Sequence, residues 1–331
     1  MTTITTYVTR GKINESTHNS KCIIKDSNYN TIFSTNDDND LVYPRSAIKI
    51  FQAIPFIKSN AYKKYKLNTK QLAISCASHC GEREHIQVLQ DWLKKIKKNK
   101  KILQCGIHNP LNLDSSNKLL LKGNKANQLH NNCAGKHLGM LSGCLMHNMD
   151  LNNYLDFKHP YQKNIRKHLE YFMECKIQNK QKGVDGCNAP QYAFPLNKIA
   201  ISMIKLAKTY SGSLPFSTEI KLLLNAISKY PHLTGGLKKY DSQLMRITNG
   251  RIFAKGGAEG VILFVDKDKK IGGIIKVSDG NNRALPSSAN EIFKKLNILN
   301  KNELQELSKW TNEIIINHAN QKIGKIYTII K

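Results

Sequence analysis

The β-rich segments of this chain lie near its two ends, and the helical segments lie between them. Runs rich in β-branched and aromatic residues occur in 21–35, in 251–277 and in 323–330. Helical periodicity prevails from residue 46 to about residue 245. Strands so remote in sequence most simply join one antiparallel sheet. The order therefore predicts an α/β (α+β) fold, with an antiparallel sheet built from both chain ends, flanked by helices, and a helical lobe from the middle of the chain.

Two hairpins are expected among these strands. The first spans 21–35 around the turn-rich segment Asp26–Asn30. The second joins a strand over 260–265 to a strand over 271–277 through Asp266–Lys269. The hairpins come from opposite ends of the chain, which is the distribution that a single shared sheet requires.

The clearest helix is expected over 83–98. Its apolar residues Ile86, Leu89 and Leu93 fall on one face, and lysines fill the other face. Further helices are expected over 46–58, after the segment Asn131–His137 through about Met146, over 158–176, over 195–209, over 217–229 with Ser217 as N-cap, and from a capping box at Ser288–Glu291 to Leu296.

The domain prediction follows from this order. Residues 1–331 are expected to form a single catalytic domain, with a sheet part over about 1–45 and 246–331 and a helical part over about 46–245. Ser46 lies where the chain leaves the sheet part and enters the helical part. A site at Ser46 would lie in the crevice between the two parts.

The net charge is strongly positive, at +27 for 331 residues. Such a charge is typical of proteins that bind nucleic acid, and that class stays open as an alternative hypothesis. Only seven of the 51 basic residues are arginine, however, and the lysines are spread over the whole chain. Recognition of phosphates and bases favours arginine. We therefore expect a solvated, lysine-rich surface and no nucleic-acid partner.

The sequence also predicts a cytoplasmic protein without a membrane partner. It has no apolar run of transmembrane length, and residues 1–6 lack the pattern of a signal peptide. Eight cysteines are present. In a cytoplasmic protein they are expected to be reduced thiols or metal ligands rather than disulfides.

Ser46 and Lys49 form a Ser-x-x-Lys motif after Pro44. On a helix, residues three apart share one face, so the two side chains can meet. A neutral lysine can take the proton of a serine hydroxyl and make it a nucleophile. The alternative is an N-cap serine beside a solvated lysine, because so short a motif also arises by chance.

Two later motifs make the catalytic interpretation more specific. Serine acyl-enzymes carry a Ser-x-x-Lys motif, a second serine motif and a Lys-x-Gly motif in this order. Here Ser46 and Lys49 are followed by Ser78 in a loop and by Lys255 before Gly257 at the end of a strand. A second lysine disfavours double protonation, and Ser78 would bridge the two amines and relay a proton. Backbone N–H groups of Ser46 and near Gly257 would face the oxyanion.

A second cluster of candidate residues combines two thiols and an amine. Cys133, Lys136 and Cys187 have neighbours that could complete a tetrahedral zinc site, namely His137 and Asp185. The sequence contains no paired Cys-x-x-Cys motif that would support this assignment. Buried thiols, with His137 as a hydrogen-bonded core residue, are the alternative.

Together, these motifs resemble the third structural class of L-asparaginases, the rhizobial, thermolabile type. The resemblance extends in family order over roughly residues 13 to 284. The blocks that carry it are Glu15–His18, Tyr43–Lys49, Cys76–Glu82, Cys105–Pro110, His130–His137, Val184–Cys187 and Lys255–Val261.

The resemblance implies a fold similar to serine β-lactamases and glutaminases. It implies hydrolysis of L-asparagine to L-aspartate and ammonia through a serine acyl-enzyme with two Ser–Lys pairs. Ser46 would be the nucleophile paired with Lys49, and Ser78 would pair with Lys255. A homodimer is also implied.

The same resemblance implies a cofactor and a binding set. One zinc ion per chain, which would not be the direct catalyst, would be held by Cys133, Lys136 and Cys187. The substrate would be bound by Arg45, His79, Lys136 and Asp185.

Three positions depart from the family pattern. Ile50 stands where proline is expected, Ala134 replaces a serine, and Gly256 occupies the middle of the Lys-Thr-Gly motif. Without the threonine hydroxyl, one substrate hydrogen bond worth about 0.5–1.5 kcal/mol would be missing. A β-lactam-interacting serine enzyme of the same fold remains the alternative function.

Overall fold

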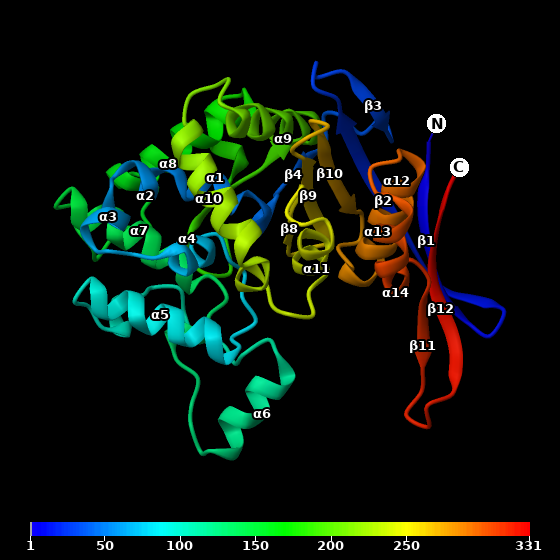
Figure 1. Cartoon of the computed structure of the whole chain (residues 1–331), viewed down its shortest axis with the longest axis horizontal. Helices are drawn as coiled ribbons and strands as arrows, with labels where there is room; N and C mark the ends of the chain where they lie inside the picture. The colour runs from blue at the N-terminus through cyan, green and yellow to red at the C-terminus, as the bar shows by residue number, and fades with distance from the viewer. Residues whose placement is uncertain (1) are drawn as a thin grey trace. The chain divides into compact units, whose positions relative to one another are not determined.

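The structure of the protein is a computed structural model that describes residues 2–331. The chain forms two compact units, each of which is assembled from separate stretches of sequence. The first unit comprises the chain up to Ala47, Phe194–Lys208 and Leu244–Lys331. The second comprises Ile48–Ala193 and Thr209–Gln243. Figure 1 follows the chain from blue to red and labels the main elements.

The first unit is organised around an antiparallel sheet in which strands from both chain ends are neighbours. This confirms the predicted fold class. The strand order is β11 (Glu313–Ile316), β12 (Lys322–Ile330), β1 (Ile4–Arg10), β2 (Ile13–Lys25), β10 (Ile271–Val277), β9 (Val261–Asp266) and β8 (Ile252–Gly257), and β3 (Thr31–Ser34) pairs with β2. Both predicted hairpins are present, as β2–β3 and β9–β10.

The sheet packs against helix α12 (Leu285–Lys295), which contacts β1, β10 and β12. Every residue of β9 is buried, and Phe264 in this strand meets Phe293 of α12 with the ring centroids 4.6 Å apart. Burying an aromatic side chain is a large hydrophobic contribution, so this contact anchors the helix on the sheet. Two short helices, α13 (Lys301–Glu306) and α14 (Ser308–Thr311), follow α12.

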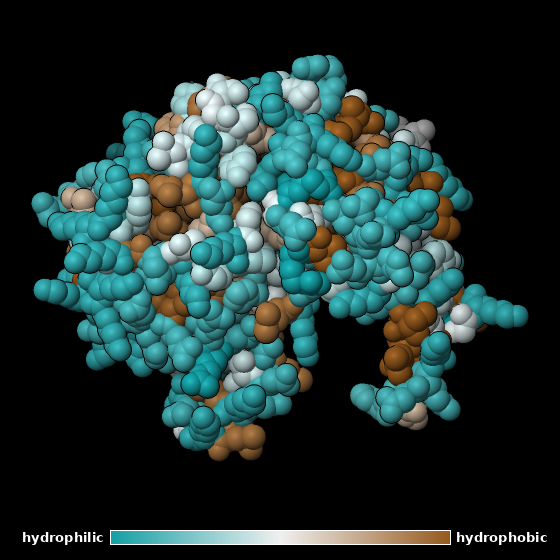
Figure 2. Space-filling view, viewed as in Figure 1, coloured by the Kyte–Doolittle hydropathy of each residue, from teal (hydrophilic) through white to brown (hydrophobic). Residues whose placement is uncertain are grey.

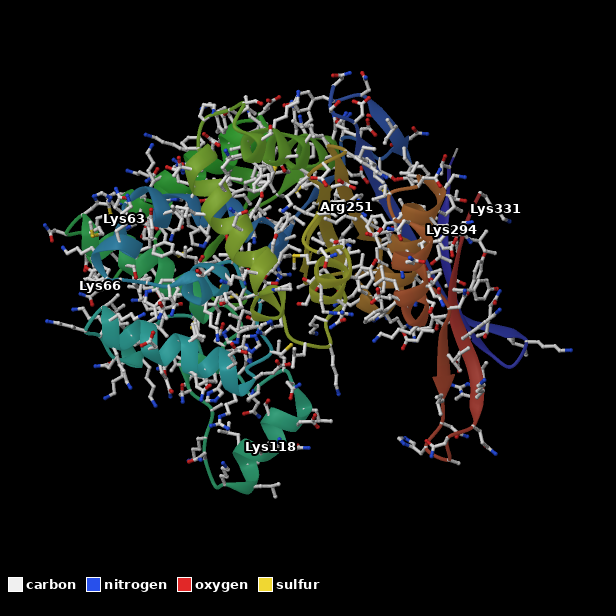
Figure 3. The ribbon with its side chains drawn as sticks, viewed as in Figure 1. Lys63, Lys66, Lys118, Arg251, Lys294 and Lys331 are labelled. Carbon is white, nitrogen blue, oxygen red and sulfur yellow. The ribbon has the colours of Figure 1, made fainter. Side chains whose placement is uncertain are left out.

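Arg251, labelled in Figure 3, lies just before β8 and joins three elements of this unit. Its guanidinium donates hydrogen bonds to Asp266 at the end of β9 and, at 2.8 Å, to both oxygens of Glu303 in α13. The Asp266 side chain is fully buried. A buried carboxylate requires a partner, so Arg251 stabilises the join between the sheet and α13.

The second unit is mostly helical. Its core helix is α7 (Ala134–Met146), which is buried from Ala134 to Cys144. Trp92 of the neighbouring α5 donates from Nε1 to Ser142 Oγ of α7 at 3.0 Å. The other helices are α1 (Lys49–Gln52), α2 (Ile54–Lys58), α3 (Ala61–Lys64), α4 (Thr69–Ile74), α5 (Arg83–Lys95), α6 (Leu113–Leu121), α8 (Pro160–Met173) and α10 (Ser217–Lys229).

Several short elements complete the fold. Helices α9 (Leu196–Ser211) and α11 (Tyr240–Ile247) each contribute residues to both units. The short strand pairs are β4 (Leu41–Val42) with β7 (Phe194–Pro195), and β5 (Lys182–Val184) with β6 (Pro190–Tyr192). None of the helices in residues 2–331 has the length and apolar composition of a membrane-spanning segment.

Two predicted N-cap residues are wrong, although the bounds predicted for the helix over 217–229 are those of α10. Ser217 is the first residue of α10, and Phe216 is its N-cap. Ser288 lies inside α12, which begins at Leu285 with a proline in its first turn. Proline favours the first turn of a helix because its missing N–H needs no partner there. The Ser288 hydroxyl instead bonds Thr6 Oγ1 of β1 at 2.9 Å, which ties the helix to the sheet.

The expected helix over 46–58 is present in three pieces. A 3₁₀ turn, η1 (Arg45–Ile48), leads into α1, and α2 follows after Ala53. Pro55 lies in the first turn of α2, and proline disfavours a continuous helix through the residues before it. The helix α6 was not predicted, because its residues include no buried face that would give a clear period.

The surface is largely hydrophilic on the face shown in Figure 2. Lys63, Lys66 and Lys118 extend outward from the second unit (Figure 3), as a solvated lysine-rich surface predicts. Brown, apolar side chains gather on α6 and on β11 in Figure 2. Leu121 in α6 is 87% exposed and Ile316 in β11 is 56% exposed.

Candidate active site

In the first unit, Ser46 lies in a strained turn. Arg45 directly before it has a φ of +51°, which is the left-handed region that non-glycine residues rarely adopt. The turn is closed by a hydrogen bond from Ala47 N–H to Pro44 O at 3.0 Å. Strain of this kind is concentrated at functional sites, where the surrounding structure holds it in place. Ser46 is only 9% exposed, so its hydroxyl is held in a largely water-poor position.

The end of β8 packs backbone to backbone against this turn. A Cβ added to Gly257 would stand 2.7 Å from Pro44 O and 3.4 Å from Ala47 N. Only glycine permits such an approach. The Lys-Gly-Gly motif and the serine motif, which are more than 200 positions apart in sequence, are therefore neighbours within the first unit.

Lys255 and Arg45 are the candidate cationic residues of the first unit. Lys255 is 2% exposed, and its Nζ donates to Gly256 O at 2.9 Å. Arg45 forms a long ion pair with Glu259 at 4.0 Å, and the Glu259 side chain is mostly exposed. The Lys255 side chain is thus secluded from water, whereas the Arg45 side chain is partly exposed to water.

In the second unit, Lys49 is fully buried and has three acceptors. Its Nζ donates to Ala77 O, to Ser78 Oγ at 2.9 Å and to Cys133 Sγ at 3.1 Å. An ammonium has three N–H donors, so this environment satisfies it completely. The backbone N–H of Ser78 donates to Thr234 O at 2.8 Å and holds the serine in place. The structure therefore brings Lys49 and Ser78 together, as the predicted proton relay requires.

Cys133, Lys136 and Cys187 form a second buried group in the same unit. Each of the three is at most 4% exposed, and Lys136 Nζ donates to Cys187 Sγ at 3.3 Å. The hydrogen bond from Cys133, together with the Lys136 charge, lowers the pKa of Cys187 to about 5. The same hydrogen bond and burial raise the pKa of Cys133 to about 12. The thiolate form is therefore favoured at Cys187 and disfavoured at Cys133.

This group fits a zinc ion by donor type. Two cysteine sulfurs and one nitrogen are ligands that zinc accepts, and the group is dry enough for a stable site. Across residues 2–331, no three side chains among His, Cys, Asp and Glu gather as a metal site. Neither His137 nor Asp185 is therefore gathered with the cysteine pair, although the sequence offers both as residues that could complete a tetrahedral site. The Lys136 amine is the third donor that remains beside the two cysteine sulfurs.

Asp185 lies in a turn between β5 and β6. Its Oδ1 accepts a hydrogen bond from Gly186 N–H at 3.0 Å, and its backbone N–H donates to Ala189 O at 2.9 Å. The Asp185 side chain is 8% exposed, and its negative charge helps to raise the pKa of Lys136. Asp185 thus belongs to the surroundings of the thiol–amine group.

His79 is fully buried beside Ser78. Its Nδ1 accepts the Gly81 N–H at 3.2 Å, and its ring stacks on His85 with the centroids 5.1 Å apart. Its Nε2 has no partner among the described residues. Burial holds the pKa of His79 well below its usual value and lowers the pKa of His85 to about 4. Both rings are therefore neutral at physiological pH.

Tyr154 is the residue near this site that sequence reasoning missed. Its hydroxyl lies 2.7 Å from His137 Nδ1 and accepts the Gln104 N–H at 3.0 Å. Burial lowers the pKa of His137 to about 3 and raises that of Tyr154. Tyr154 follows His137 by 17 residues, in an irregular segment without a motif, so no sequence signal indicates the contact.

Comparison with known proteins gives one decisive result. A search of curated protein sequences finds no significant match. Among solved structures, a "putative beta-lactamase from Bacteroides dorei DSM 17855" is 11% identical, and the alignment covers 88% of this chain and 93% of that one. Its TM-score of 0.37 is too low to transfer a fold or an activity. The family model of L-asparaginase II matches residues 6–328. Because that match spans nearly the entire sequence, the chain belongs to the L-asparaginase II family.

Proposed function

We propose that this chain hydrolyses L-asparagine to L-aspartate and ammonia through an acyl-enzyme on Ser46. Family membership makes it an amidohydrolase that acts on asparagine. The observation that supports the serine mechanism best is the contact of the buried Lys49 amine with Ser78 Oγ at 2.9 Å. Lys49 follows Ser46 by three residues, so a nucleophile, an amine and a second hydroxyl would form a chain of proton carriers.

In the first half-reaction, Ser46 Oγ attacks the side-chain amide carbon of asparagine. The serine proton passes to Lys49, which has given one of its own protons to Ser78. Ser78 in turn protonates the amide nitrogen, with Lys255 as its partner lysine. The C–N bond breaks, ammonia leaves, and the aspartyl group is esterified to Ser46.

In the second half-reaction, water attacks the ester carbon. One proton of this water passes to the same carriers, which deliver it to Ser46 Oγ as the C–O bond to the enzyme breaks. The other proton stays on the new carboxyl group, which ionises to the carboxylate. L-Aspartate is released. The negative charge that develops on the carbonyl oxygen in both halves would be stabilised by backbone N–H groups of the Ser46 turn and of the β8 end. The close approach of Gly257 to that turn supports this assignment.

Four residues would bind the amino-acid head group. Arg45 carries the charge that suits the α-carboxylate, Lys136 would offer an N–H group to it, and Asp185 carries the charge that suits the α-ammonium. His79 would act only through Nε2, since its other nitrogen is already bonded. Charge-assisted hydrogen bonds are the strongest available to a small polar substrate.

The replacement of Ser46 tests the mechanism. Ser46→Ala should lower ammonia release from L-asparagine by about 10³-fold or more, since nucleophile loss leaves only binding and oxyanion contributions. The circular dichroism spectrum and thermal midpoint should stay unchanged. Ser20→Ala is the matched control, because Ser20 is a buried serine of the first unit whose hydroxyl bonds Ser288 at 3.2 Å. Full activity in Ser46→Ala would contradict the proposal.

Cys133, Lys136 and Cys187 are proposed to hold one zinc ion per chain. Bound zinc would supply a fixed positive charge beside the amino-acid head group. A lysine binds a metal only when deprotonated, so zinc affinity should fall as the pH falls.

Metal analysis of freshly purified protein tests the zinc site. Cys133→Ser/Cys187→Ser should lose the zinc, whereas Cys22→Ala/Cys144→Ala should keep it, since both control cysteines are buried and belong to no thiol–amine group. Stoichiometric zinc in the first variant would rule the site out.

The homodimer and the cytoplasmic location stay predictions. Light scattering coupled to gel filtration measures whether the protein is a dimer.

A further inference from the structure

A fully buried histidine in α7 uses only one of its two ring nitrogens. His137 is 0% exposed, and its Nδ1 lies 2.7 Å from the Tyr154 hydroxyl. Its Nε2 is buried and has no hydrogen-bond partner within the described part of the chain. Leaving a buried polar atom without a partner costs folding free energy, and nearly all such atoms in native proteins find one. Nε2 therefore needs a partner from outside the described residues, such as a ligand or an ordered water.

Tyr154 determines which ring nitrogen carries the proton. The phenolic oxygen already accepts the Gln104 N–H at 3.0 Å, and the tyrosine is itself fully buried. If His137 donated from Nδ1, the phenolic proton would be left without an acceptor in this dry environment. The arrangement that satisfies both groups has the phenol donating to Nδ1, and the proton of the neutral imidazole is then on Nε2.

The phenol is held firmly enough to impose this choice. Gln162, which is 1% exposed, donates from Nε2 to the backbone oxygen of Tyr154 at 2.8 Å. The two rings meet edge to face, with an interplanar angle of 86° and the centroids 5.7 Å apart. Tyr154 therefore fixes both the tautomer and the orientation of the His137 ring.

The surroundings of His137 indicate what Nε2–H would bind. On α7 the residue directly follows Lys136, one of the three proposed zinc ligands. Its backbone N–H donates to Cys133 O at 3.1 Å, so His137 lies one helical turn after Cys133. Cys133 Sγ in turn accepts a hydrogen bond from Lys49 Nζ at 3.1 Å. A neutral N–H donor among them suits an oxygen acceptor, such as a carboxylate or carbonyl oxygen of an amino acid.

We propose that Tyr154 is a positioning residue that presents His137 as an Nε2–H donor to an oxygen of bound L-asparagine. This inference rests on the proposed function, in which the same cluster binds the substrate head group. It also excludes His137 as a zinc ligand, since a protonated Nε2 has no lone pair to offer a metal and Nδ1 is occupied by the phenol.

Steady-state kinetics of ammonia release provide the first test. Tyr154→Phe should raise KM for L-asparagine about 2- to 10-fold and leave kcat within about 2-fold. This is the effect of losing one neutral hydrogen bond that the substrate makes equally in the ground state and in the transition state. His137→Leu should show at least that increase, and His137→Gln should recover part of it because glutamine keeps an N–H donor.

Tyr161→Phe is the matched control. Tyr161 is as deeply buried as Tyr154, but its hydroxyl has no partner in residues 2–331. Its removal should leave KM and kcat unchanged. An equal change in KM for both tyrosine variants would overturn the proposal, because it would indicate general loosening of the second unit.

A spectroscopic readout separates this inference from the proposed function. The imidazole ¹⁵N resonances of His137 should show a protonated Nε2, and that signal should shift when L-aspartate is added. In Tyr154→Phe, the fraction of His137 rings that carry the proton on Nε2 should fall. A bare Nε2, or a signal that ignores saturating L-aspartate in an enzyme that hydrolyses asparagine, would contradict the proposal.

Measurement of zinc content provides a further test of the proposal. His137→Gln should keep the zinc of the parent protein, and loss of the metal would show that His137 is a ligand. An enzyme without asparagine hydrolysis would instead contradict the proposed function, while the ¹⁵N tautomer of His137 would still be measurable in it.

Discussion

At the scale of single residues, Gly257 has little freedom to change. An added Cβ would stand 2.7 Å from Pro44 O, which is backbone and cannot move without displacing the Ser46 turn. Gly257→Ala should lower kcat/KM for asparagine about 10- to 100-fold, since small misplacements of reacting groups are costly. Assays of ammonia release measure this. Gly139→Ala, where the nearest atom is a Phe56 carbon at 3.6 Å, should be tolerated, and equal losses in both variants would contradict the argument.

The sequence predicted chemically distinctive site residues and missed the ones that position them. Ser46, Lys49 and Ser78 belong to motifs whose order points to a chemistry, and the structure brings Lys49 and Ser78 into contact. Tyr154 reaches His137 from an irregular segment, so nothing in its neighbours indicates the hydrogen bond. A contact between segments without a shared period can be found only once the chain is folded.

At the scale of elements, Arg251 joins the β8–β9 end of the sheet to α13. Arg251→Met would leave the fully buried Asp266 without its cation, and removing one partner of a buried pair costs about 3–5 kcal/mol. Urea unfolding followed by circular dichroism measures the loss. Arg246→Met is the control, because Arg246 pairs with Glu306 at 3.6 Å and both side chains are more than half exposed. A change below about 0.5 kcal/mol is expected there, and comparable losses in both variants would contradict the prediction.

Elements with a clear period were predicted closely, and those whose ends depend on tertiary contacts were not. The amphipathic helix expected over 83–98 is α5 (Arg83–Lys95), and the hairpin turn at Asp266–Lys269 joins β9 to β10. The expected cap at Ser288 is wrong because its hydroxyl bonds β1 instead of a helix end. Serine caps and serine cross-links have the same local sequence, so only the packed sheet distinguishes them.

At the scale of the whole molecule, buried neutral histidines make stability depend on pH. Burial lowers the pKa of His85 to about 4, whereas an unfolded histidine titrates near 6.5. Between these two pKa values, His85 binds a proton in the unfolded chain and stays neutral in the folded chain. The free energy of unfolding therefore falls as the pH falls from about 6.5 toward 4. From pH 7 to pH 5, His85 alone should contribute a loss of about 2 kcal/mol.

Urea unfolding at the two pH values measures this dependence. His85→Gln should lose less stability than the parent protein between pH 7 and pH 5. His318→Gln, at an exposed position, is the control for removing one histidine. Identical pH dependence in His85→Gln and the parent would contradict the assignment of the proton uptake to His85.

The order of elements along the whole chain was predictable, because strand and helix patterns separate cleanly by position. The pairing of the two chain ends has a consequence for synthesis. Thr3 and Lys331 exchange backbone hydrogen bonds at 3.0 Å, and β1 lies between β2 and β12. During translation, at about 5–20 residues per second, the first strand must wait roughly 15–65 seconds for its last neighbour to be made. Until β12 has been made, one edge of β1 has no strand partner, and such an edge can pair with other nascent chains.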